Sequence, residues 1–435
     1  MALPAETGRV MIELSCLQMY IMQTTKIQGA TMSESKNIFH SGSAAGAFFT
    51  SICLWGIGVG CFAASMNNFL SEICQMDQLD RGWLEFFREL PGVAVVFVLA
   101  LMHRISDWKI MRIGTAVSMV GAALLFVSRD KIFITAVIML WSMGEHLVMP
   151  VRSTIAMQVA KSSRVGESLG YLTSAMNFGS VMGSLIVMGI FFAGSRFFCW
   201  EKTTLFNIVW AVIIVLLMIS IISTFSPNAP NAPSKRPRIY FNRKFSKFYA
   251  LELFYGARKQ VFLTFAPYVM IREYGFSTAS MALLFGVCAG VNIFGAPLIG
   301  RLTDRLGYRN IMIWDTVILF FVCLLYGFVG DIFPARIAIA VLCINFLLDA
   351  VISTTSMATN IYVKKLSDSQ DELTSTLSTG LSINHVIAIL SAPLGGWVWQ
   401  RYGIGVLFSF AAIMAVANTL FAMTIPKTEN RQHKL

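Results

Sequence analysis

The chain has 435 residues, of which 56% are hydrophobic and only 13% are charged. Soluble proteins typically carry about 25% charged residues, so the composition excludes an ordinary water-soluble domain. The formal net charge of +11 does not indicate nucleic-acid binding, because the basic residues sit in short gaps between apolar runs. Cytoplasmic loops of membrane proteins carry Lys and Arg in this way. The eight cysteines form no CxxC pair, so we expect neither a disulfide framework nor a cysteine metal site.

Apolar runs long enough to cross a bilayer recur along almost the whole chain, since a spanning helix needs roughly 20 residues. In the first half they lie near residues 44–70, 83–103, 110–128, 132–157, 167–194 and 204–225. In the second half they lie near residues 248–271, 278–299, 310–329, 335–360, 374–399 and 404–425. The runs are too long and unbroken for the strands of a membrane barrel. The sequence therefore predicts an all-α polytopic membrane protein with twelve transmembrane helices in two six-helix bundles.

One linker, rich in proline and basic residues, separates the two sets of six runs. The predicted parts are an N-terminal tail, a first bundle, the linker, a second bundle and a short tail, at residues 1–43, 44–225, 226–247, 248–426 and 427–435. Lys and Arg are more frequent in the even-numbered gaps, which predicts that both termini and the linker are cytoplasmic. The N-terminal residues lack the pattern of a signal peptide, and Met32 is an alternative start. We expect a multi-pass protein of the cell inner (plasma) membrane.

The two halves resemble each other weakly at corresponding places. Arg104-Ile105-Ser106-Asp107 follows the second run, and Arg301-Leu302-Thr303-Asp304 follows the eighth. The decapeptide from Gly300 to Arg309, Gly-Arg-Leu-Thr-Asp-Arg-Leu-Gly-Tyr-Arg, resembles the loop signature of the major facilitator superfamily, Gly-x-Leu-x-Asp-Arg-x-Gly-x-Arg/Lys. With the six-linker-six layout, the chain is similar to that family over about residues 44–426.

This resemblance implies a secondary transporter that rocks two helix bundles about a central site. In the family the loop helps to latch the bundles on the cytoplasmic side, a role that would fall to Gly300, Asp304, Arg305 and Arg309, with Asp107 as the first-half counterpart. The first-half copy departs from the pattern, because His103 and Trp108 replace its Gly and Arg. The fifth run also lacks the Gly-Pro element of many drug-exporting members, which weakens a drug exporter as an alternative.

Ionisable side chains inside the apolar runs are the candidates for function, because a charge at the bilayer centre costs about 2.5–3.5 kcal/mol on insertion scales. Arg258 and Lys259 are adjacent near the middle of the seventh run. Helical neighbours point about 100° apart, so we expect one to face the central cavity and the other to pair with a neighbouring helix. The substrate-binding candidates are Arg258, Lys259, Gln260, Glu145 and Asn384, and the proton-coupling candidates are Glu145, Asp349 and His385.

The cationic centre predicts a small polar solute, anionic or zwitterionic, moved together with a coupling proton or sodium ion. The competing interpretation is that these charges form ion pairs that only hold helices in register. Glu85, Arg88 and Glu89 near the start of the second run predict an outer gate, or a snorkelling ion pair near the membrane interface.

Several enzyme motifs are absent from the sequence, which has no HExxH motif, no P-loop and no GxGxxG dinucleotide fingerprint. Only two of the five histidines, His146 and His385, lie inside predicted spans away from their ends, so we predict no metal site and no cofactor. We expect a monomer in the lipid bilayer. A non-transporting receptor or sensor on the same fold is the main alternative, and a membrane-embedded enzyme is a weaker one.

Overall fold

The computed structural model describes residues 38–40, 42–161, 164–225 and 241–426. Nearly all of the predicted N-terminal tail, with Met32, lies outside these residues. So do residues 226–240 of the predicted linker and the C-terminal tail at 427–435. The predicted bounds of the parts stay predictions.

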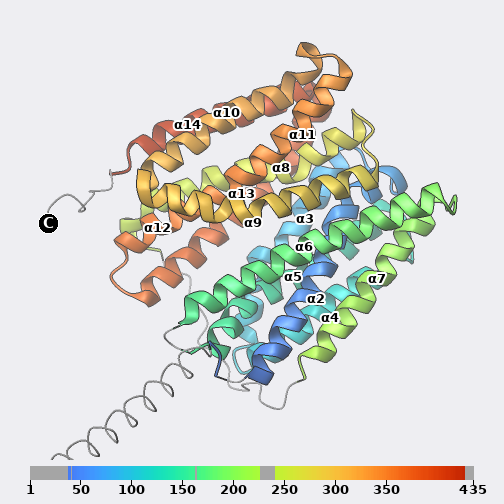
Figure 1. Cartoon of the computed structure of the whole chain (residues 1–435). Helices are drawn as coiled ribbons and strands as arrows, with labels where there is room; N and C mark the ends of the chain where they lie inside the picture. The colour runs from blue at the N-terminus through green and yellow to red at the C-terminus, as the bar shows by residue number, and fades with distance from the viewer. Residues whose placement is uncertain (1–37, 41, 162–163, 226–240, 427–435) are drawn as a thin grey trace, which may run out of the picture.

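Twelve helical segments follow one another along the described residues (Figure 1). Those of the first half are α2 (Gly42–Asn68) with its continuation η1 (Phe69–Ile73), α3 (Gln78–Leu101), α4 (Asp107–Leu124), α5 (Lys131–Val159), α6 (Val165–Arg196) and α7 (Lys202–Ser223). Those of the second half are α8 (Ser246–Arg272) with its lead-in η3 (Arg243–Phe245), α9 (Thr278–Leu306), α10 (Tyr308–Ile332), α11 (Ala335–Ile352) continued by η4 (Ser353–Thr355) and α12 (Ser356–Leu366), α13 (Gln370–Tyr402) and α14 (Ile404–Met423). The prediction of an all-α fold is confirmed.

Nine of these segments are long and apolar enough to cross a membrane, by length and composition alone and within the described residues. The other three segments, α3, α4 and α8, each carry several charged residues. They pack against the apolar segments, and α3 and α8 hold most of the residues that the sequence marks as functional.

Helix α3 begins five residues before the predicted run, and its N-terminal cap explains the difference. The Asp77 side chain accepts a hydrogen bond from the backbone N–H of Asp80 (2.8 Å), and the Asp80 side chain accepts one from the N–H of Asp77 (3.1 Å). This reciprocal capping satisfies two backbone donors that a helix start leaves open. As a result, Arg81 and Glu85 belong to the same helix as Arg88 and Glu89.

Each half packs mainly on itself, and the two halves meet mainly through two helix pairs. In the first half α2 packs against α6 and α7, and α5 against α3 and α4; in the second half α10 packs against α11 and α14, and α8 against α13. Between the halves, α3 runs along α13 and α6 runs along α9 (Figure 1).

The halves are in closest contact at one end of the molecule, which comprises the start of α3 and the ends of α8 and α13. A Cβ atom on Gly82 would lie 2.6 Å from the carbonyl oxygen of Ala392, and one on Gly396 would lie 2.5 Å from that of Gln78. The Tyr268 hydroxyl donates to the carbonyl of Met76 at the same end (2.5 Å). We call this the Arg81 end; the charge bias of the loops predicts that it faces outward.

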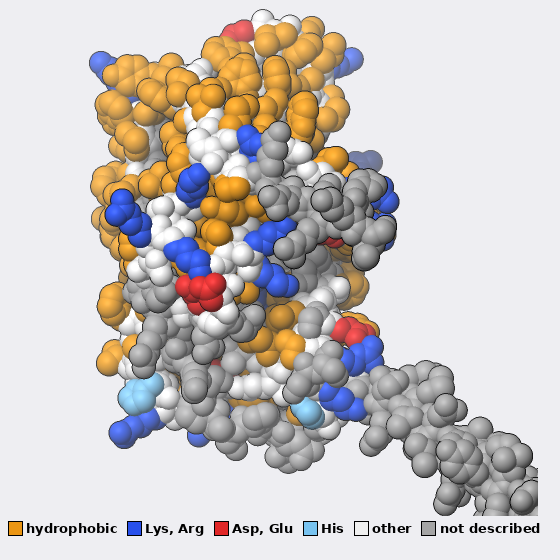
Figure 2. All heavy atoms as spheres, turned by 90° about the vertical axis from the view of Figure 1, so that its left-hand side faces the viewer, with side chains coloured by type: hydrophobic (Ala, Val, Ile, Leu, Met, Phe, Trp, Pro, Cys, Tyr) orange, Lys and Arg blue, Asp and Glu red, His pale blue; other side chains and the backbone are white. Residues whose placement is uncertain are grey.

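The opposite end is basic. Figure 2 views the molecule from the side where α9 and α12 end, and shows Lys and Arg side chains gathered over part of that surface. The exposed basic residues there include Arg243, Lys244, Arg301, Arg305, Lys364 and Lys365. This surface fits the prediction that this end faces the cytoplasm.

Close backbone approach between α2 and α6 gives a test of the fold. A Cβ atom on Gly183 would lie 2.5 Å from the backbone oxygen of Ile57 and 2.5 Å from the backbone nitrogen of Cys61. Gly183→Ala should therefore force the helices apart and lower the free energy of unfolding by about 1–3 kcal/mol, measured by thermal or denaturant unfolding in detergent.

Gly189 is the matched control, because it lies on the same helix and no heavy atom lies within 4 Å of the position of its missing Cβ. Alanine has the higher helix propensity, so Gly189→Ala should not destabilise the protein. Equal stability of the two variants would contradict the packing described here.

Candidate functional site

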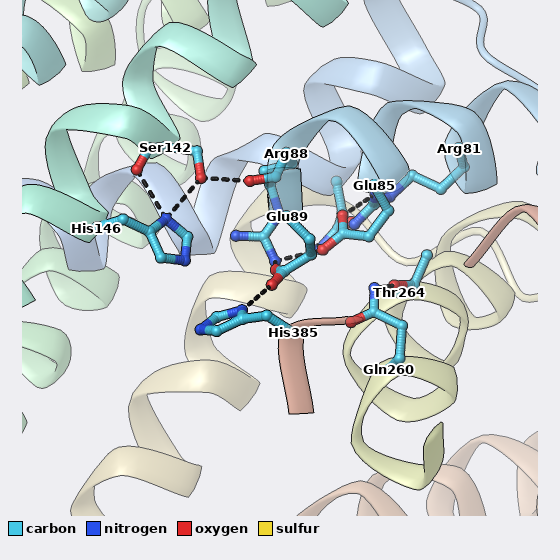
Figure 3. Close-up of polar contacts among 10 residues, drawn as sticks. Arg81, Glu85, Arg88, Glu89, Ser142, His146, Gln260, Thr264 and His385 are labelled. Atoms are coloured by element: carbon cyan, nitrogen blue, oxygen red, sulfur yellow. Dashed lines mark hydrogen bonds and ion pairs between the residues drawn. The ribbon is translucent and has the colours of Figure 1, made fainter. Parts of the chain in front are cut away.

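A chain of buried ion pairs follows one face of α3 (Figure 3). The Arg81 guanidinium donates to Glu85 Oε2 (2.5 Å), and Arg88 donates from Nε to Glu85 Oε1 (2.7 Å) and from Nη2 to Glu89 Oε1 (2.6 Å). Spacings of four and three residues place Arg81, Glu85 and Arg88 on neighbouring turns, and Glu89 directly follows Arg88. Arg81 and Glu85 are each only 1% exposed, so the protein interior satisfies these charges.

The chain of contacts crosses from the first half to the second at Glu89. The carboxylate oxygen Oε2 of Glu89 accepts a hydrogen bond from Nδ1 of His385 on α13 (2.8 Å). Its other oxygen is held by Arg88. The Glu89 carboxylate is therefore bound by one residue of each half, at the contact between α3 and α13 (Figure 3).

His146 on α5 completes this cluster. Its ring centroid lies 5.0 Å from that of His385, and its Nδ1 lies 2.8 Å from the backbone oxygen of Ser142. Only an N–H can donate to a carbonyl, so Nδ1 carries the proton and Nε2 of the neutral ring keeps its lone pair. The Ser142 hydroxyl in turn donates to the carbonyl of Arg88 (2.5 Å), which ties α5 to α3.

A second buried ion group lies within the second half. Arg258 on α8 is 4% exposed and donates to both oxygens of Asp315 on α10 (3.1 and 3.3 Å) and to Asp349 on α11 (3.3 Å). One guanidinium thus stands between two carboxylates. Sequence reasoning named Arg258 and Asp349 but missed Asp315, although a lone carboxylate in the run at 310–329 was a usable signal.

Lys259, the next residue, has a different environment. It is half-buried and makes no hydrogen bond or ion pair with any residue in the described ranges. Its charge acts on Glu252 of the same helix and on Glu89 of the other half, so its ammonium group lies toward the contact between the halves. Gln260, by contrast, is buried and donates to Thr264 of its own helix (2.6 Å). Asn384 is also buried and lies 3.5 Å from Glu252.

Glu145 on α5 has an environment similar to that of Lys259 but carries the opposite charge. It is half-buried and, among the described residues, has no hydrogen-bond or ion-pair partner. Its charge acts on Arg88, His146 and Arg152. Each half therefore contributes one uncompensated charge close to the Arg88–Glu89–His385 contacts, Glu145 from the first and Lys259 from the second.

The signature loop lies at the basic end. Gly307 separates α9 from α10 with φ of +82°, a conformation that favours glycine. Asp304 and Arg305 are exposed, and Gly300 is half-exposed. Arg309 donates to the carbonyl of Met423 in its own half (2.6 Å). On the first-half side, Asp107 is buried and accepts a hydrogen bond from Gln158 (3.0 Å).

One group of three metal-ligating side chains occurs within the described part of the chain. Glu89, His146 and His385 each offer one ligand atom, and these atoms lie within 4.8 Å of one another. The prediction of no metal site was based on the histidines alone, and Glu89 was predicted to belong to an outer gate.

Solved structures of membrane transporters resemble this fold. The nucleoside transporter NupG is 14% identical, with a TM-score of 0.67 over 88% of this chain and 98% of that one. A POT family transporter in complex with a thioalcohol-conjugated peptide is 11% identical, with a TM-score of 0.70 over 87% and 95%. A D-xylose-proton symporter is 14% identical, with a TM-score of 0.69 over 89% and 98%. At these identities the likeness shows the fold alone.

No curated protein sequence matches the chain. The sequence profile of the Major Facilitator Superfamily matches residues 82–368, which is more than half of the chain. This match agrees with the signature loop and the arrangement of the helices. The chain therefore belongs to the Major Facilitator Superfamily, and it is a membrane transporter rather than an enzyme.

Proposed function

We propose that the protein is a secondary active transporter that moves a small zwitterionic or anionic solute by alternating access, coupled to protons. The observation that carries this proposal is Lys259, a half-buried cation with no counter-ion in the described residues. Its charge acts on Glu89 across the contact between the halves. Transporters with repeated halves bind their substrates near the midplane where the repeats meet.

An uncompensated ammonium group inside a membrane protein is costly, and a bound anion would offset that cost. A carboxylate would form a charge-assisted hydrogen bond with it, which is stronger than a neutral one. Arg258 is a poorer candidate for this contact, because Asp315 and Asp349 already bind its guanidinium. The geometry therefore favours Lys259 as the cationic centre of the site.

Glu145 supports a zwitterion in particular. It is an unpaired carboxylate on the first half, whereas Lys259 belongs to the second. A solute with one ammonium and one carboxylate group would contact both halves at once. Its binding would then depend on how the halves are arranged, which is the requirement for a ligand that shifts a conformational equilibrium.

The Arg258 group supports proton coupling. Two carboxylates share one guanidinium, which leaves one negative charge in excess, and burial favours the protonated form of a carboxyl group. The other titratable groups nearby, Tyr255, Tyr326, Cys288 and Cys323, are of types that are neutral at pH 7. Asp349 or Asp315 would therefore carry the proton. Arg258 adjoins Lys259 in sequence, so this proton would change the field at the proposed solute site.

The arrangement of the halves supports a state that is open toward the basic end. Backbone contacts at Gly82 and Gly396 close the Arg81 end, while the signature residues Asp304 and Arg305 are exposed. Opening the Arg81 end would require the contact between Glu89 and His385 to break. Glu85, Arg88 and Glu89 would then act as the outer gate.

Replacing Lys259 tests the solute site. A panel of amino acids, organic anions and sugars should contain ligands that raise the melting temperature of the purified protein, because binding at a hundredfold excess over Kd adds about 2.7 kcal/mol to stability. Lys259→Met should abolish the shift for anions and zwitterions. Glu145→Gln should abolish it for zwitterions while sparing anions.

Lys364→Met serves as the control, because Lys364 is an exposed lysine at the basic end and should leave every shift intact. A folded Lys259→Met variant with wild-type ligand shifts would contradict the site assignment.

Replacing Asp349 tests the coupling. Asp349→Asn leaves a one-to-one pair between Arg258 and Asp315, which has no excess negative charge to protonate. In proteoliposomes, accumulation driven by an imposed proton gradient should fall to the level of passive exchange, while solute counterflow continues.

Asp368→Asn is the matched control. Asp368 is an exposed carboxylate whose hydrogen bond from Lys244 (2.6 Å) raises the pKa of that lysine. Pairs between exposed side chains contribute little to stability, so this variant should accumulate solute normally. Undiminished proton-driven accumulation by Asp349→Asn would place the coupling elsewhere.

A further inference from the structure

We propose that Glu89, His146 and His385 form a binding site for a divalent transition-metal ion such as Zn²⁺, shared between the two halves. The three residues come from α3, α5 and α13, and their exposed fractions are 7%, 5% and 5%. Their ligand atoms lie within 4.8 Å of one another. This inference goes beyond the proposed transport of a zwitterion or anion and does not depend on it.

The two imidazole nitrogens and the carboxylate oxygen suit a metal ion of intermediate hardness, such as Zn²⁺. Zinc binds imidazole nitrogen and carboxylate oxygen at about 2.0–2.2 Å in tetrahedral geometry, so ligand atoms around it stand about 3.4 Å apart. Glu89 Oε2 and His385 Nδ1 are already 2.8 Å apart. The widest separation, at most 4.8 Å, must shrink by no more than about 1.4 Å, which is within reach of small side-chain rotations. Two histidines and one glutamate leave a fourth position for water or another ligand.

His146 is already oriented as a ligand. Its Nδ1–H donates to the backbone oxygen of Ser142 (2.8 Å), which leaves the lone pair of Nε2 free to bind a metal. Metal-ligating histidines commonly donate their second nitrogen to a carbonyl in this way, which fixes the tautomer and the ring orientation. Within the described ranges, Nε2 of His146 has no hydrogen-bond partner of its own.

Gly92 leaves the space in which the two imidazoles meet. A Cβ atom on Gly92 would lie 2.7 Å from Nδ1 of His385 and 2.9 Å from Nε2 of His146. Both nitrogens therefore face the same small volume beside the α3 backbone. Any other residue at this position would displace the rings.

The surrounding side chains favour a transition-metal ion over Mg²⁺ or Ca²⁺. Glu85 is paired with Arg81 and Arg88, and Glu89 is paired with Arg88, so these arginines offset the carboxylate charge that Mg²⁺ or Ca²⁺ would require. Those ions also prefer oxygen ligands, whereas imidazoles select transition metals. Coordination through Nδ1 of His385 would replace the proton that it now donates to Glu89.

Metal binding can be measured on the purified full-length protein without any transport assay. The protein should carry a tag without histidine and the Cys199→Ser substitution, because Cys199 is an exposed thiol that could bind zinc itself. We expect one saturable Zn²⁺ per chain by competition with a chromophoric chelator, no competition by Mg²⁺, and a visible Co²⁺ spectrum of tetrahedral type.

Substitutions then assign the ligands. His146→Gln and His385→Gln, one in each half, should each weaken zinc binding by more than the roughly 10–100-fold typical of second-shell changes. The isosteric Glu89→Gln should weaken it as well. His103→Gln is the control, because His103 is an exposed histidine after α3, and it should bind as the parent does.

Two results would overturn the proposal. One is the absence of saturable zinc binding to the folded parent protein, which needs no variant. The other is unchanged zinc affinity in folded His146→Gln and His385→Gln variants. Circular dichroism and a monodisperse elution profile establish folding in each case, and Glu89→Gln decides the ligand assignment if a histidine variant does not fold.

Discussion

The cost of leaving a charge uncompensated inside the bilayer governs the arrangement of this protein. Along α3 this cost is met by a continuous series of partners, in which Arg81, Glu85, Arg88 and Glu89 alternate in sign. The series ends on His385 of the opposite half, so the Glu89 carboxylate is held by one residue from each half. Breaking one partner of a buried pair typically costs several kcal/mol, which makes this contact suitable for a gate that opens only when another interaction replaces it.

Charged side chains without an ion-pair partner are the strongest candidates for solute binding. Lys259 and Glu145 stand out because neither has a hydrogen-bond or ion-pair partner among the described residues, and because they come from different halves. The contact between α3 and α13 brings together the glycines that permit close backbone approach and the cluster of Glu89, His146 and His385. The proposed solute site, the proposed gate and the proposed metal site therefore all lie where the halves meet.

The sequence was sufficient for the helices but not for their contacts. Long apolar runs predict spans because a helix alone satisfies its backbone in lipid, and charged residues within the runs at 83–103 and 248–271 mark the helices that line the interior. The capping box at Asp77 and Asp80 was missed, so α3 was predicted five residues short. The sequence predicts that Arg258 and Lys259 point in different directions from one helix. Which of the two is paired, and which is left for a solute, depends on Asp315, which lies on a different helix. Likewise, Glu89 and His385 are 296 residues apart, and only the tertiary fold brings them together.

If the protein works by alternating access, the closed contact at the Arg81 end must open during transport. Spin labels at Gln78 on α3 and Arg401 on α13, in a background without other reactive cysteines, would report the separation of the halves there by pulsed electron paramagnetic resonance. We predict a short distance in the absence of solute and a second, longer population when a transported solute is added. A single short distance under all conditions, in protein that transports, would contradict the account.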